Sequence, residues 1–230
     1  MKKYQVLLFD LDDTLLDFQK NEYEALGALF QRLNHPLTDE IRRLYHGINQ
    51  DMWRAYERGE LEREVLLNTR FARLFEALGE QVDGPMAEGI YREELGKGAF
   101  LIDGALEVCT ALSRRYPICI ATNGVGRTQR QRLTDSGLAP LVSQVFVSEE
   151  IGCAKPGEPF FRYVFDHLEG ISPKNMLLVG DSLSSDIRGG INSGMDTCWY
   201  NPKGGESGET APTYEISNLR ELLPMLLEEA

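Results

Sequence analysis

The sequence predicts an α/β fold in which a Rossmann-like parallel sheet carries an inserted block of helices. The first apolar run, Tyr4–Phe9, is short and stops abruptly at acidic residues, as a buried parallel strand does at its carboxyl end. Residues 99–230 then alternate strand and helix patterns, which is typical of βαβ crossovers with helices on both faces of the sheet. Residues 17–98 show helical periodicity without a convincing strand. We therefore expect an α/β core from residues 1–16 and 99–230 and an all-helical insertion from residues 17–98.

Length and composition limit the possible functions. The chain has 230 residues, of which 42% are hydrophobic and 26% charged, as in an ordinary soluble globular protein. A formal net charge of −12 argues against a nucleic-acid partner, because phosphate backbones are held by an excess of Lys and Arg. The apolar runs are shorter than the roughly 18 residues of a membrane span, and the first is too short for a signal-peptide core. We expect a cytoplasmic protein without a membrane partner, whose oligomeric state the sequence leaves open.

The cysteines give no sign of a metal or redox motif. They are scattered, and no two of them form a CxxC pair. The four are Cys109, Cys119, Cys153 and Cys198. We expect reduced and mostly buried thiols.

Four helices are expected in the inserted block. Apolar residues recur at helical spacing in each segment, and Gly or Pro interrupts the pattern between them. Thr38 is the expected N-cap of the second helix. The segments are 21–33, 41–56, 63–78 and the stretch from Pro85 to Gly96.

The α/β core is expected to contain four further strands and five helices. The predicted strands are 118–121, 145–147, 176–179 and, as the last strand, 197–200. The predicted helices are 104–115, 126–136, 158–168, 184–193 and a closing helix at 218–229. A glycine-rich loop at 204–208 precedes the closing helix.

Polar residues stand where the predicted strands end, and in open α/β sheets ligands bind at that edge. They are Asp10, Asp12 and Asp13 after the first strand, Thr122 and Asn123 after the second, Lys155 after the third, and Asp181 and Asp186 after the fourth. Taken singly, these groups are also consistent with turns, a surface lysine or a helix N-cap. Closely spaced carboxylates repel one another, so a folded chain needs a bound cation, shifted pKa values or solvent exposure.

In chain order, these groups resemble the four motifs of the haloacid dehalogenase superfamily of phosphohydrolases. The motifs are DxDxT, a hydrophobic strand followed by Thr, Lys-Pro, and GDxxxxD, and the resemblance covers essentially the whole chain. It implies that Asp10 attacks phosphorus to form an aspartyl-phosphate and that Asp12 is the general acid and base. It also implies that Thr122 and the backbone of Asn123 bind the phosphoryl group and that Lys155 neutralises Asp10 and the phosphate.

The same resemblance implies a magnesium cofactor. Asp10, Asp181 and the main-chain carbonyl of Asp12 would hold the ion, and Asp186 would act directly or through a water. Carboxylate and carbonyl oxygens suit Mg²⁺, whereas zinc favours His and Cys. Asp13 is expected to have a structural role.

Several reactions stay open within this resemblance. Asp12 favours a phosphatase over a dehalogenase, because a halide leaves without a proton. The substrate could be another small phosphate ester such as phosphoglycolate, and a sugar phosphomutase would share both Asp10 and Asp12. A non-catalytic scaffold with the same fold is the alternative of a different class, and the presence of Asp10, Asp12, Lys155 and Asp181 argues against it.

The helical block resembles the type-1 cap of the superfamily, which closes over the leaving group. Its segments 49–59 and 69–71 closely resemble the pyrimidine 5'-nucleotidases of the YjjG/YfnB type, which implies a nucleoside 5'-monophosphate as the substrate. The residues expected to contact its base and sugar are Phe18, Asn49, Trp53, Tyr56 and Arg70. A tryptophan at helical spacing is also an ordinary core residue, so the role of Trp53 stays open.

Overall fold

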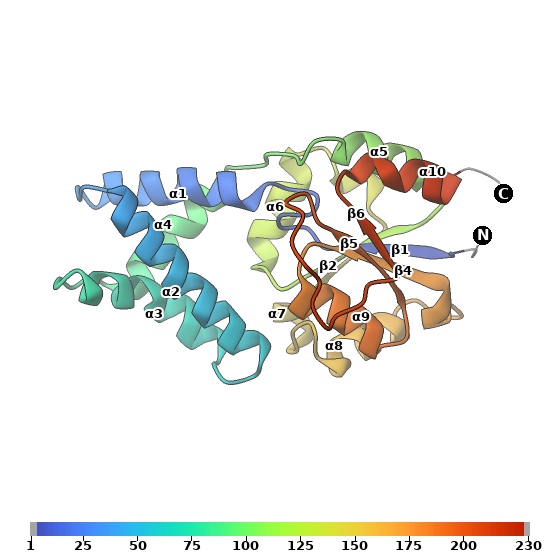
Figure 1. Ribbon diagram of the computed structural model, residues 1–230. Coiled ribbons are helices and arrows are strands. Elements are labelled where there is room, and N and C mark those ends of the chain that lie inside the picture. The colour runs from blue at the N-terminus through green and yellow to red at the C-terminus, as the bar shows by residue number, and fades with distance from the viewer. Residues whose placement is uncertain (1–3, 228–230) are drawn as a thin grey trace. The chain divides into compact units, whose positions relative to one another are not determined.

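The computed structural model describes residues 4–227, which divide into two compact units. One unit holds the described residues of Met1–Phe18 and Ala99–Ala230, and the other is Gln19–Gly98. The first contains a parallel sheet (Figure 1). Its strands lie in the order β3 (Gln144–Val147), β2 (Ile118–Thr122), β1 (Val6–Phe9), β4 (Met176–Gly180), β5 (Asp196–Tyr200) and β6 (Tyr214–Ile216). The predicted α/β class with a parallel sheet is confirmed. The action of residues 17–98 as a cap stays a prediction.

The strand β1 (Val6–Phe9) lies inside the sheet, and all of its residues are buried. It pairs in parallel with β2 and β4, so that Phe9 lies opposite Ile120 on one side and Val179 on the other. This register brings the residues after β1, β2 and β4 to one edge of the sheet.

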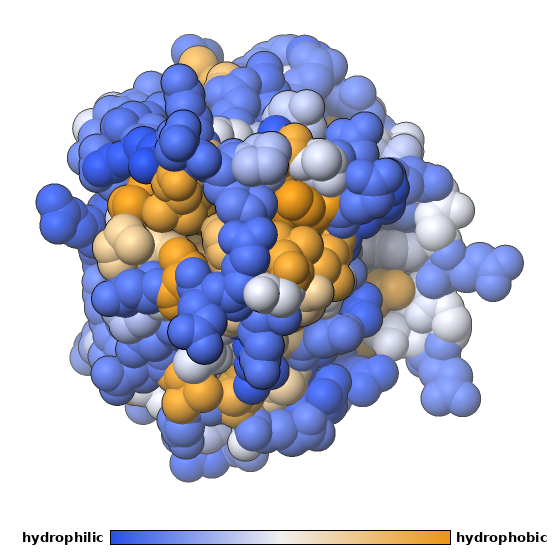
Figure 2. Space-filling model, turned by 90° about the vertical axis from the view of Figure 1, so that its left-hand side faces the viewer, coloured by the Kyte–Doolittle hydropathy of each residue, from blue (hydrophilic) through white to orange (hydrophobic). Residues whose placement is uncertain are grey.

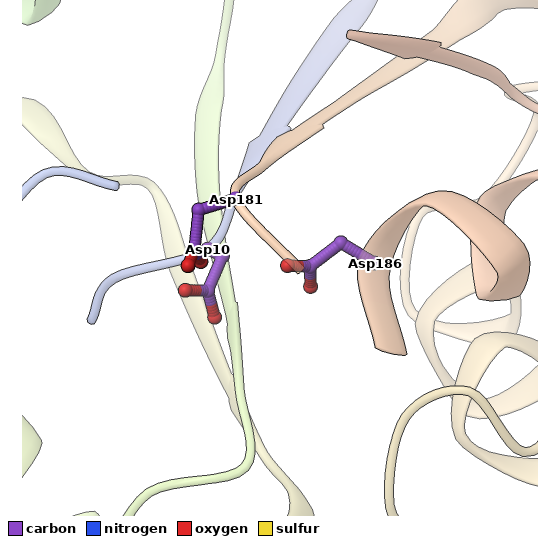
Figure 3. A group of neighbouring side chains, drawn as sticks. All are labelled: Asp10, Asp181 and Asp186. Carbon is purple, nitrogen blue, oxygen red and sulfur yellow. The ribbon is translucent and has the colours of Figure 1, made fainter. Parts of the chain in front are cut away.

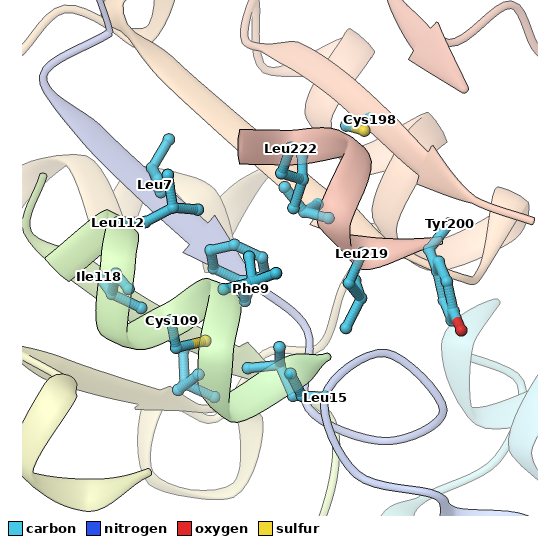
Figure 4. Close-up of a cluster of buried hydrophobic side chains, with 14 of the residues drawn as sticks. Leu7, Phe9, Leu15, Cys109, Leu112, Ile118, Cys198, Tyr200, Leu219 and Leu222 are labelled. Atoms are coloured by element: carbon cyan, nitrogen blue, oxygen red, sulfur yellow. The ribbon is translucent and has the colours of Figure 1, made fainter. Parts of the chain in front are cut away.

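Apolar side chains of β1 alternate between two cores. Leu7 and Phe9 belong to the cluster on one face of the sheet, whereas Val6 and Leu8 belong to the cluster on the other. Figure 4 shows Leu7 and Phe9 in the first cluster with side chains of α5 (Ala105–Ser113), β2 and β5. The predicted arrangement, with helices on both faces of a buried parallel strand, is confirmed.

The remaining helices of this unit connect the strands or follow the last one. They are α6 (Gly126–Asp135), α7 (Ser148–Ile151), α8 (Glu158–Asp166), α9 (Arg188–Asn192) and α10 (Leu222–Leu227). The predicted helix at 184–193 is instead a turn of π-helix, Leu183–Ile187, followed by α9. The short helix α7 was not predicted.

The interpretation of 197–200 as the last strand is wrong, because β6 pairs with β5 beyond it. β6 spans only Tyr214–Ile216, which is too short for an alternating pattern to stand out. The predicted closing helix at 218–229 is shorter on its amino side, where Leu219–Glu221 form a 3₁₀ turn before α10. Pro224 falls in the first turn of α10, where a missing N–H is tolerated. Glu228 and Glu229 lie outside the described residues.

The helical unit contains the four expected helices. They are α1 (Phe18–Arg32), which starts at the last residue of the other unit, α2 (Asp39–Glu57), α3 (Arg63–Ala77) and α4 (Gly84–Leu95). Thr38 is the N-cap of α2, as predicted, and its hydroxyl accepts a hydrogen bond from the backbone N–H of Ile41 at 3.3 Å.

The face shown in Figure 2 is mostly hydrophilic and carries groups of apolar residues between the polar ones. Leu44, Val65 and Met86 are exposed apolar residues of the helical unit. Within residues 4–227, none of the helices combines the length and hydropathy required to span a membrane.

Candidate active site

Three carboxylates meet at the edge where β1 and β4 end. Asp10 follows β1, and its backbone N–H donates to the carbonyl of Val179 at 2.8 Å. Asp181 follows β4, and Asp186 lies in the π-helical turn after it. One oxygen of each carboxylate lies within 4.8 Å of the others (Figure 3). The structure thus brings together three predicted site residues that are far apart in the sequence.

Lys155 is the cation of this cluster. Its ammonium group donates to Asp10 Oδ1 at 2.6 Å, to Asp186 Oδ1 at 2.7 Å and to the carbonyl of Ala121 at 2.6 Å. Lys155 is only 1% exposed. A buried ammonium group satisfied by two carboxylates and a carbonyl is fixed in place and cannot be an ordinary surface lysine.

The side chain of Asn123 holds the backbone of Lys155. Its Nδ2 donates to the Lys155 carbonyl at 3.0 Å, and its Oδ1 accepts from the Lys155 N–H at 2.9 Å. The sequence motif predicted only a phosphate-binding role for the Asn123 backbone. The structure adds a side-chain function, which is to tie the end of β2 to the loop that carries Lys155.

The electrostatics of the cluster favour an additional cation. Burial raises the pKa of Asp10 to about 8, Lys155 opposes that shift, and the charges of Asp186 and Asp12 add to it. Burial, followed by the charges of Asp10 and Asp186, also raises the pKa of Asp181 well above its usual value. Burial alone would lower the pKa of Lys155, but Asp10 and Asp186 outweigh it and raise that pKa. Three carboxylates around one ammonium group leave negative charge that a divalent cation would balance.

The donor set fits a hard divalent cation. Asp10, Asp181 and Asp186 offer carboxylate oxygens, which are the ligands that Mg²⁺ takes, and the group is inward-facing rather than an exposed acidic patch. Zinc sites in proteins usually contain His or Cys. The cluster therefore has the chemistry of a magnesium site.

Magnesium should stabilise the protein more at pH 8 than at pH 5. With the pKa of Asp10 raised from 3.8 to about 8, the metal-free folded state keeps a proton that the unfolded chain releases, so stability falls as pH rises through this range. Mg²⁺ binds the ionised carboxylates and reverses the loss. At about one hundred times its dissociation constant, Mg²⁺ should add about 2.7 kcal/mol, or roughly 5–10 °C in Tm, at pH 8.

Differential scanning calorimetry with and without Mg²⁺ at both pH values measures this effect. Potassium chloride at matched ionic strength is the control and should leave the Tm nearly unchanged, because the cluster is shielded from diffuse ions. An equal Mg²⁺ shift at pH 5 and pH 8 would argue against binding by the buried carboxylates.

Asp12 lies beside this cluster but is held by a different element. Arg132 of α6 donates to its Oδ1, and Nε2 of Gln129 donates to its Oδ2 at 2.6 Å. Thr122 at the end of β2 joins the group, because its hydroxyl accepts a hydrogen bond from Gln129 Nε2 at 2.9 Å. Sequence reasoning missed Arg132 and Gln129, since polar residues in a predicted helix normally face solvent.

The loop after β1 is fixed by its own side chains. Asp13 has a left-handed backbone conformation with φ of 56°, and its Oδ1 accepts from the N–H of Phe18 at 3.0 Å. Trp199 of β5 donates from its indole N–H to the carbonyl of Asp181 at 2.8 Å. The hydroxyl group of Thr14 donates to Asp181 Oδ1 at 3.4 Å. These contacts order the backbone that presents the acidic residues.

Two of the residues predicted to bind a base, Asn49 and Arg70, are buried in the helical unit. Arg70 makes a bidentate ion pair with Glu88 at 2.7 and 2.8 Å and donates to Asn49 Oδ1 at 2.9 Å. Asn49 in turn donates to Glu22 at 3.1 Å. These bonds give both residues a structural role in joining α1, α2, α3 and α4. Direct substrate contacts by Asn49 and Arg70 stay a prediction that their hydrogen bonding does not favour.

The three aromatic residues of that prediction are each half-buried. Trp53 and Tyr56 lie together on α2, with ring centroids 5.7 Å apart and nearly perpendicular planes. The ring of Phe18 lies against Arg132, with its centroid 5.8 Å from the guanidinium carbon. All three side chains are thus still partly accessible to a ligand.

Comparison with known proteins gives a consistent picture. The family model for haloacid dehalogenase-like hydrolases matches residues 4–194. The chain is 46% identical over 227 residues to the HAD-hydrolase YfnB of Bacillus subtilis, covering 98% of this chain and 97% of that protein. A crystal structure of YfnB bound to magnesium gives a TM-score of 0.94 at 45% identity, covering 98% of this chain and 99% of the other.

Two further relatives are named pyrimidine 5'-nucleotidases. PynA of Streptococcus pneumoniae is 38% identical over 225 residues, which is 97% of this chain and 95% of PynA. YjjG of Escherichia coli is 32% identical over 225 residues, which is 97% of this chain and 98% of YjjG.

Proposed function

The chain belongs to the haloacid dehalogenase-like hydrolases, and from this premise we propose that it is a magnesium-dependent phosphatase whose substrate is a pyrimidine nucleoside 5'-monophosphate. The observation that carries the proposal is the buried cluster of Asp10, Asp181 and Asp186 around Lys155. In such a cluster a carboxylate can attack phosphorus, and Lys155 can balance the negative charge of the phosphate. We further propose that the protein acts in the cytoplasm.

Asp10 is the proposed nucleophile. One of its oxygens attacks phosphorus, the bond from phosphorus to the ester oxygen breaks, and an aspartyl-phosphate forms. Lys155, which contacts Asp10 at 2.6 Å, reduces the repulsion between the carboxylate and the incoming phosphate dianion. The second half-reaction is attack of water on the same phosphorus, which releases phosphate and restores Asp10.

Asp12 is the proposed acid and base for the two half-reactions. It gives a proton to the leaving ester oxygen in the first and takes a proton from the attacking water in the second. Thr122 and the backbone N–H of Asn123 are the proposed donors to the phosphoryl oxygens. Thr122 is the last residue of β2 and Asn123 follows it, and because β2 pairs with β1, these donors stand at the same sheet edge as Asp10.

Magnesium is the proposed cofactor. Asp10, Asp181 and the main-chain carbonyl of Asp12 would hold it, with Asp186 acting directly or through a water. When bound, the ion would supply positive charge for the transferring phosphoryl group. The magnesium bound to the YfnB structure supports the assignment by likeness.

The substrate class rests on two kinds of support. PynA and YjjG are named for the reaction, and each matches nearly the whole chain. Trp53 and Tyr56 are paired aromatic residues of the kind that stack on a base. A phosphatase for another ester such as phosphoglycolate, a sugar phosphomutase and a scaffold without activity are the competing possibilities.

Phosphate release from a panel of esters tests the proposal. The panel contains pyrimidine and purine nucleoside 5'-monophosphates, phosphoglycolate, a hexose 6-phosphate and p-nitrophenyl phosphate, each with Mg²⁺ or with EDTA. We expect the highest kcat/KM for a pyrimidine nucleotide and loss of activity in EDTA that Mg²⁺ restores. Absence of phosphate release from every ester would support the scaffold, and interconversion of sugar phosphates without release would support the mutase. Restoration by zinc but not magnesium would contradict the metal assignment.

Replacement of Trp53 by alanine should affect nucleotides selectively. If the indole stacks on the base, Trp53→Ala loses about 1–3 kcal/mol, which lowers kcat/KM for a pyrimidine nucleotide by roughly ten- to a hundredfold. Hydrolysis of p-nitrophenyl phosphate, which has no base, should change little. Trp53→Phe keeps an aromatic face and should retain most of the activity. Equal losses on both substrates, or an unfolded helical unit, would show that Trp53 is a core residue.

A further inference from the structure

A closed hydrogen-bond ring surrounds the carboxylate of Asp12. Arg132 donates through the same Nη1 to Asp12 Oδ1 and, at 3.0 Å, to Gln129 Oε1. Gln129 completes the ring by donating to Asp12 Oδ2 at 2.6 Å. Both oxygens of the carboxylate are thus held from one face of α6, which fixes the rotation of the carboxylate plane.

The ring extends to Thr122 and defines the direction of its hydroxyl hydrogen. Thr122 Oγ1 accepts from the backbone N–H of Gly124 at 3.0 Å and from Gln129 Nε2 at 2.9 Å. A hydroxyl group has two acceptor sites and one donor, so these bonds occupy its lone pairs and leave the hydrogen to donate. A phosphoryl oxygen is an acceptor that such a fixed donor can bind.

Burial and close packing hold this hydrogen-bond ring in place. Gln129 and Arg132 are each 1% exposed, although Arg is rarely buried unless it is paired. A Cβ at Gly124 would lie 2.3 Å from Gln129 Nε2, so a larger residue at that position would displace the amide. The aromatic side chain of Phe18 packs against Arg132, with its centroid 5.8 Å from the guanidinium carbon, and limits the other positions that the guanidinium group could take.

We propose that Arg132 and Gln129 are positioning residues that orient Asp12 for proton transfer and, through Gln129, make Thr122 a fixed donor to the phosphoryl group. This inference rests on the roles proposed above for Asp12 and Thr122. Arg132 contacts Asp12 directly and reaches Thr122 only through Gln129, whereas Gln129 contacts both groups directly. The two residues should therefore give different kinetic signatures.

The dependence on the leaving group separates positioning from a general structural effect. An alkyl ester needs a proton from Asp12, whereas p-nitrophenolate leaves with little assistance. Asp12→Asn should lower kcat for a nucleotide by about a hundredfold or more and for p-nitrophenyl phosphate far less. Arg132→Met, which keeps the length of the side chain, should lower nucleotide turnover by roughly tenfold, again with a much smaller fall for p-nitrophenyl phosphate.

A double-mutant cycle makes the test specific. Adding Arg132→Met to Asp12→Asn should cause less than about a twofold further loss on the nucleotide, because the group that Arg132 positions no longer transfers a proton. Arg130→Met is the matched control, since Arg130 is an exposed residue of the same helix that pairs with Glu150. It should keep wild-type turnover on both esters. Tm measurements on every variant identify loss of folding.

Gln129→Met supplies a second, independent variant. It should reproduce the selective loss on the nucleotide and also weaken competitive inhibition by inorganic phosphate roughly three- to tenfold, because Thr122 loses a fixing bond. Arg132→Met should weaken phosphate inhibition less than Gln129→Met does, because the hydrogen bond from Gln129 to Thr122 is still possible in that variant.

Three results would overturn the inference while leaving the phosphatase assignment intact. The first is an equal loss of turnover on both esters in folded Arg132 and Gln129 variants. The second is an undiminished further loss of turnover when Arg132→Met is added to Asp12→Asn. The third is faster nucleotide turnover in Arg132→Met, which would mean that the hydrogen-bond ring restrains Asp12. A wild-type protein with no phosphatase activity would instead refute the proposed function itself.

Discussion

Asp10→Asn should abolish phosphatase activity, with kcat on a pyrimidine nucleotide lowered by at least about a thousandfold. An amide does not attack phosphorus and is a poor ligand for a divalent cation, so one substitution removes both proposed functions of Asp10. The fold should be retained, because the amide oxygen can still accept the hydrogen bond from Lys155. Since burial raises the pKa of Asp10 to about 8, a neutral amide should also be tolerated well in the metal-free protein near neutral pH.

Single-turnover phosphate release measures the loss, and circular dichroism with thermal unfolding checks the fold. Asp135→Asn is the matched control, because Asp135 is an exposed acid on α6 that accepts hydrogen bonds from Gln131. It should behave as wild type. Turnover by purified Asp10→Asn within tenfold of wild type would refute nucleophilic catalysis by this residue, and contamination can be excluded by a second preparation from a host lacking related phosphatases.

The site residues that could be predicted from the sequence are those that stand at the ends of predicted strands. β1 is short, fully apolar and followed at once by Asp10, so both the strand and the location of its acid could be recognised. Asp181 after β4 and Thr122 in β2 follow the same rule. The parallel register of β1 with β2 and β4 then explains why separate segments converge on one edge.

The hydrogen bonds that hold the site residues in place were not predictable, because they depend on which face of a helix is buried. Gln129 and Arg132 belong to a helix with many polar residues, and nothing in their spacing separates them from Arg130, which is exposed. For Asn49 and Arg70 the sequence likewise did not show which groups they contact. Their polar character suggested a ligand-binding surface, whereas in the structure they satisfy each other and buried glutamates.

Removal of Lys155 should impair both catalysis and stability. Lys155→Met leaves three inward-facing carboxylates without their cation, and loss of one partner from a buried ion pair typically costs about 3–5 kcal/mol. The pKa values of Asp10 and Asp181 should rise further, since Lys155 opposes their upward shifts in the wild type. The folded variant would then retain protons that the unfolded chain releases, so its destabilisation should be larger at pH 8 than at pH 5. Turnover should fall by at least about a hundredfold, because the phosphate dianion would approach an unscreened carboxylate.

Urea unfolding at both pH values, with and without Mg²⁺, separates the two effects. Magnesium should recover part of the lost stability by replacing some of the missing positive charge, but it should not recover turnover, because it cannot occupy the position of the ammonium group between Asp10 and Asp186. Lys174→Met, at an exposed lysine before β4, is the matched control and should leave stability and turnover unchanged. A Lys155→Met protein that is no less stable than wild type at pH 8, or equally destabilised at both pH values, would contradict a cation that offsets the buried carboxylates. Wild-type turnover in that variant would remove Lys155 from the mechanism.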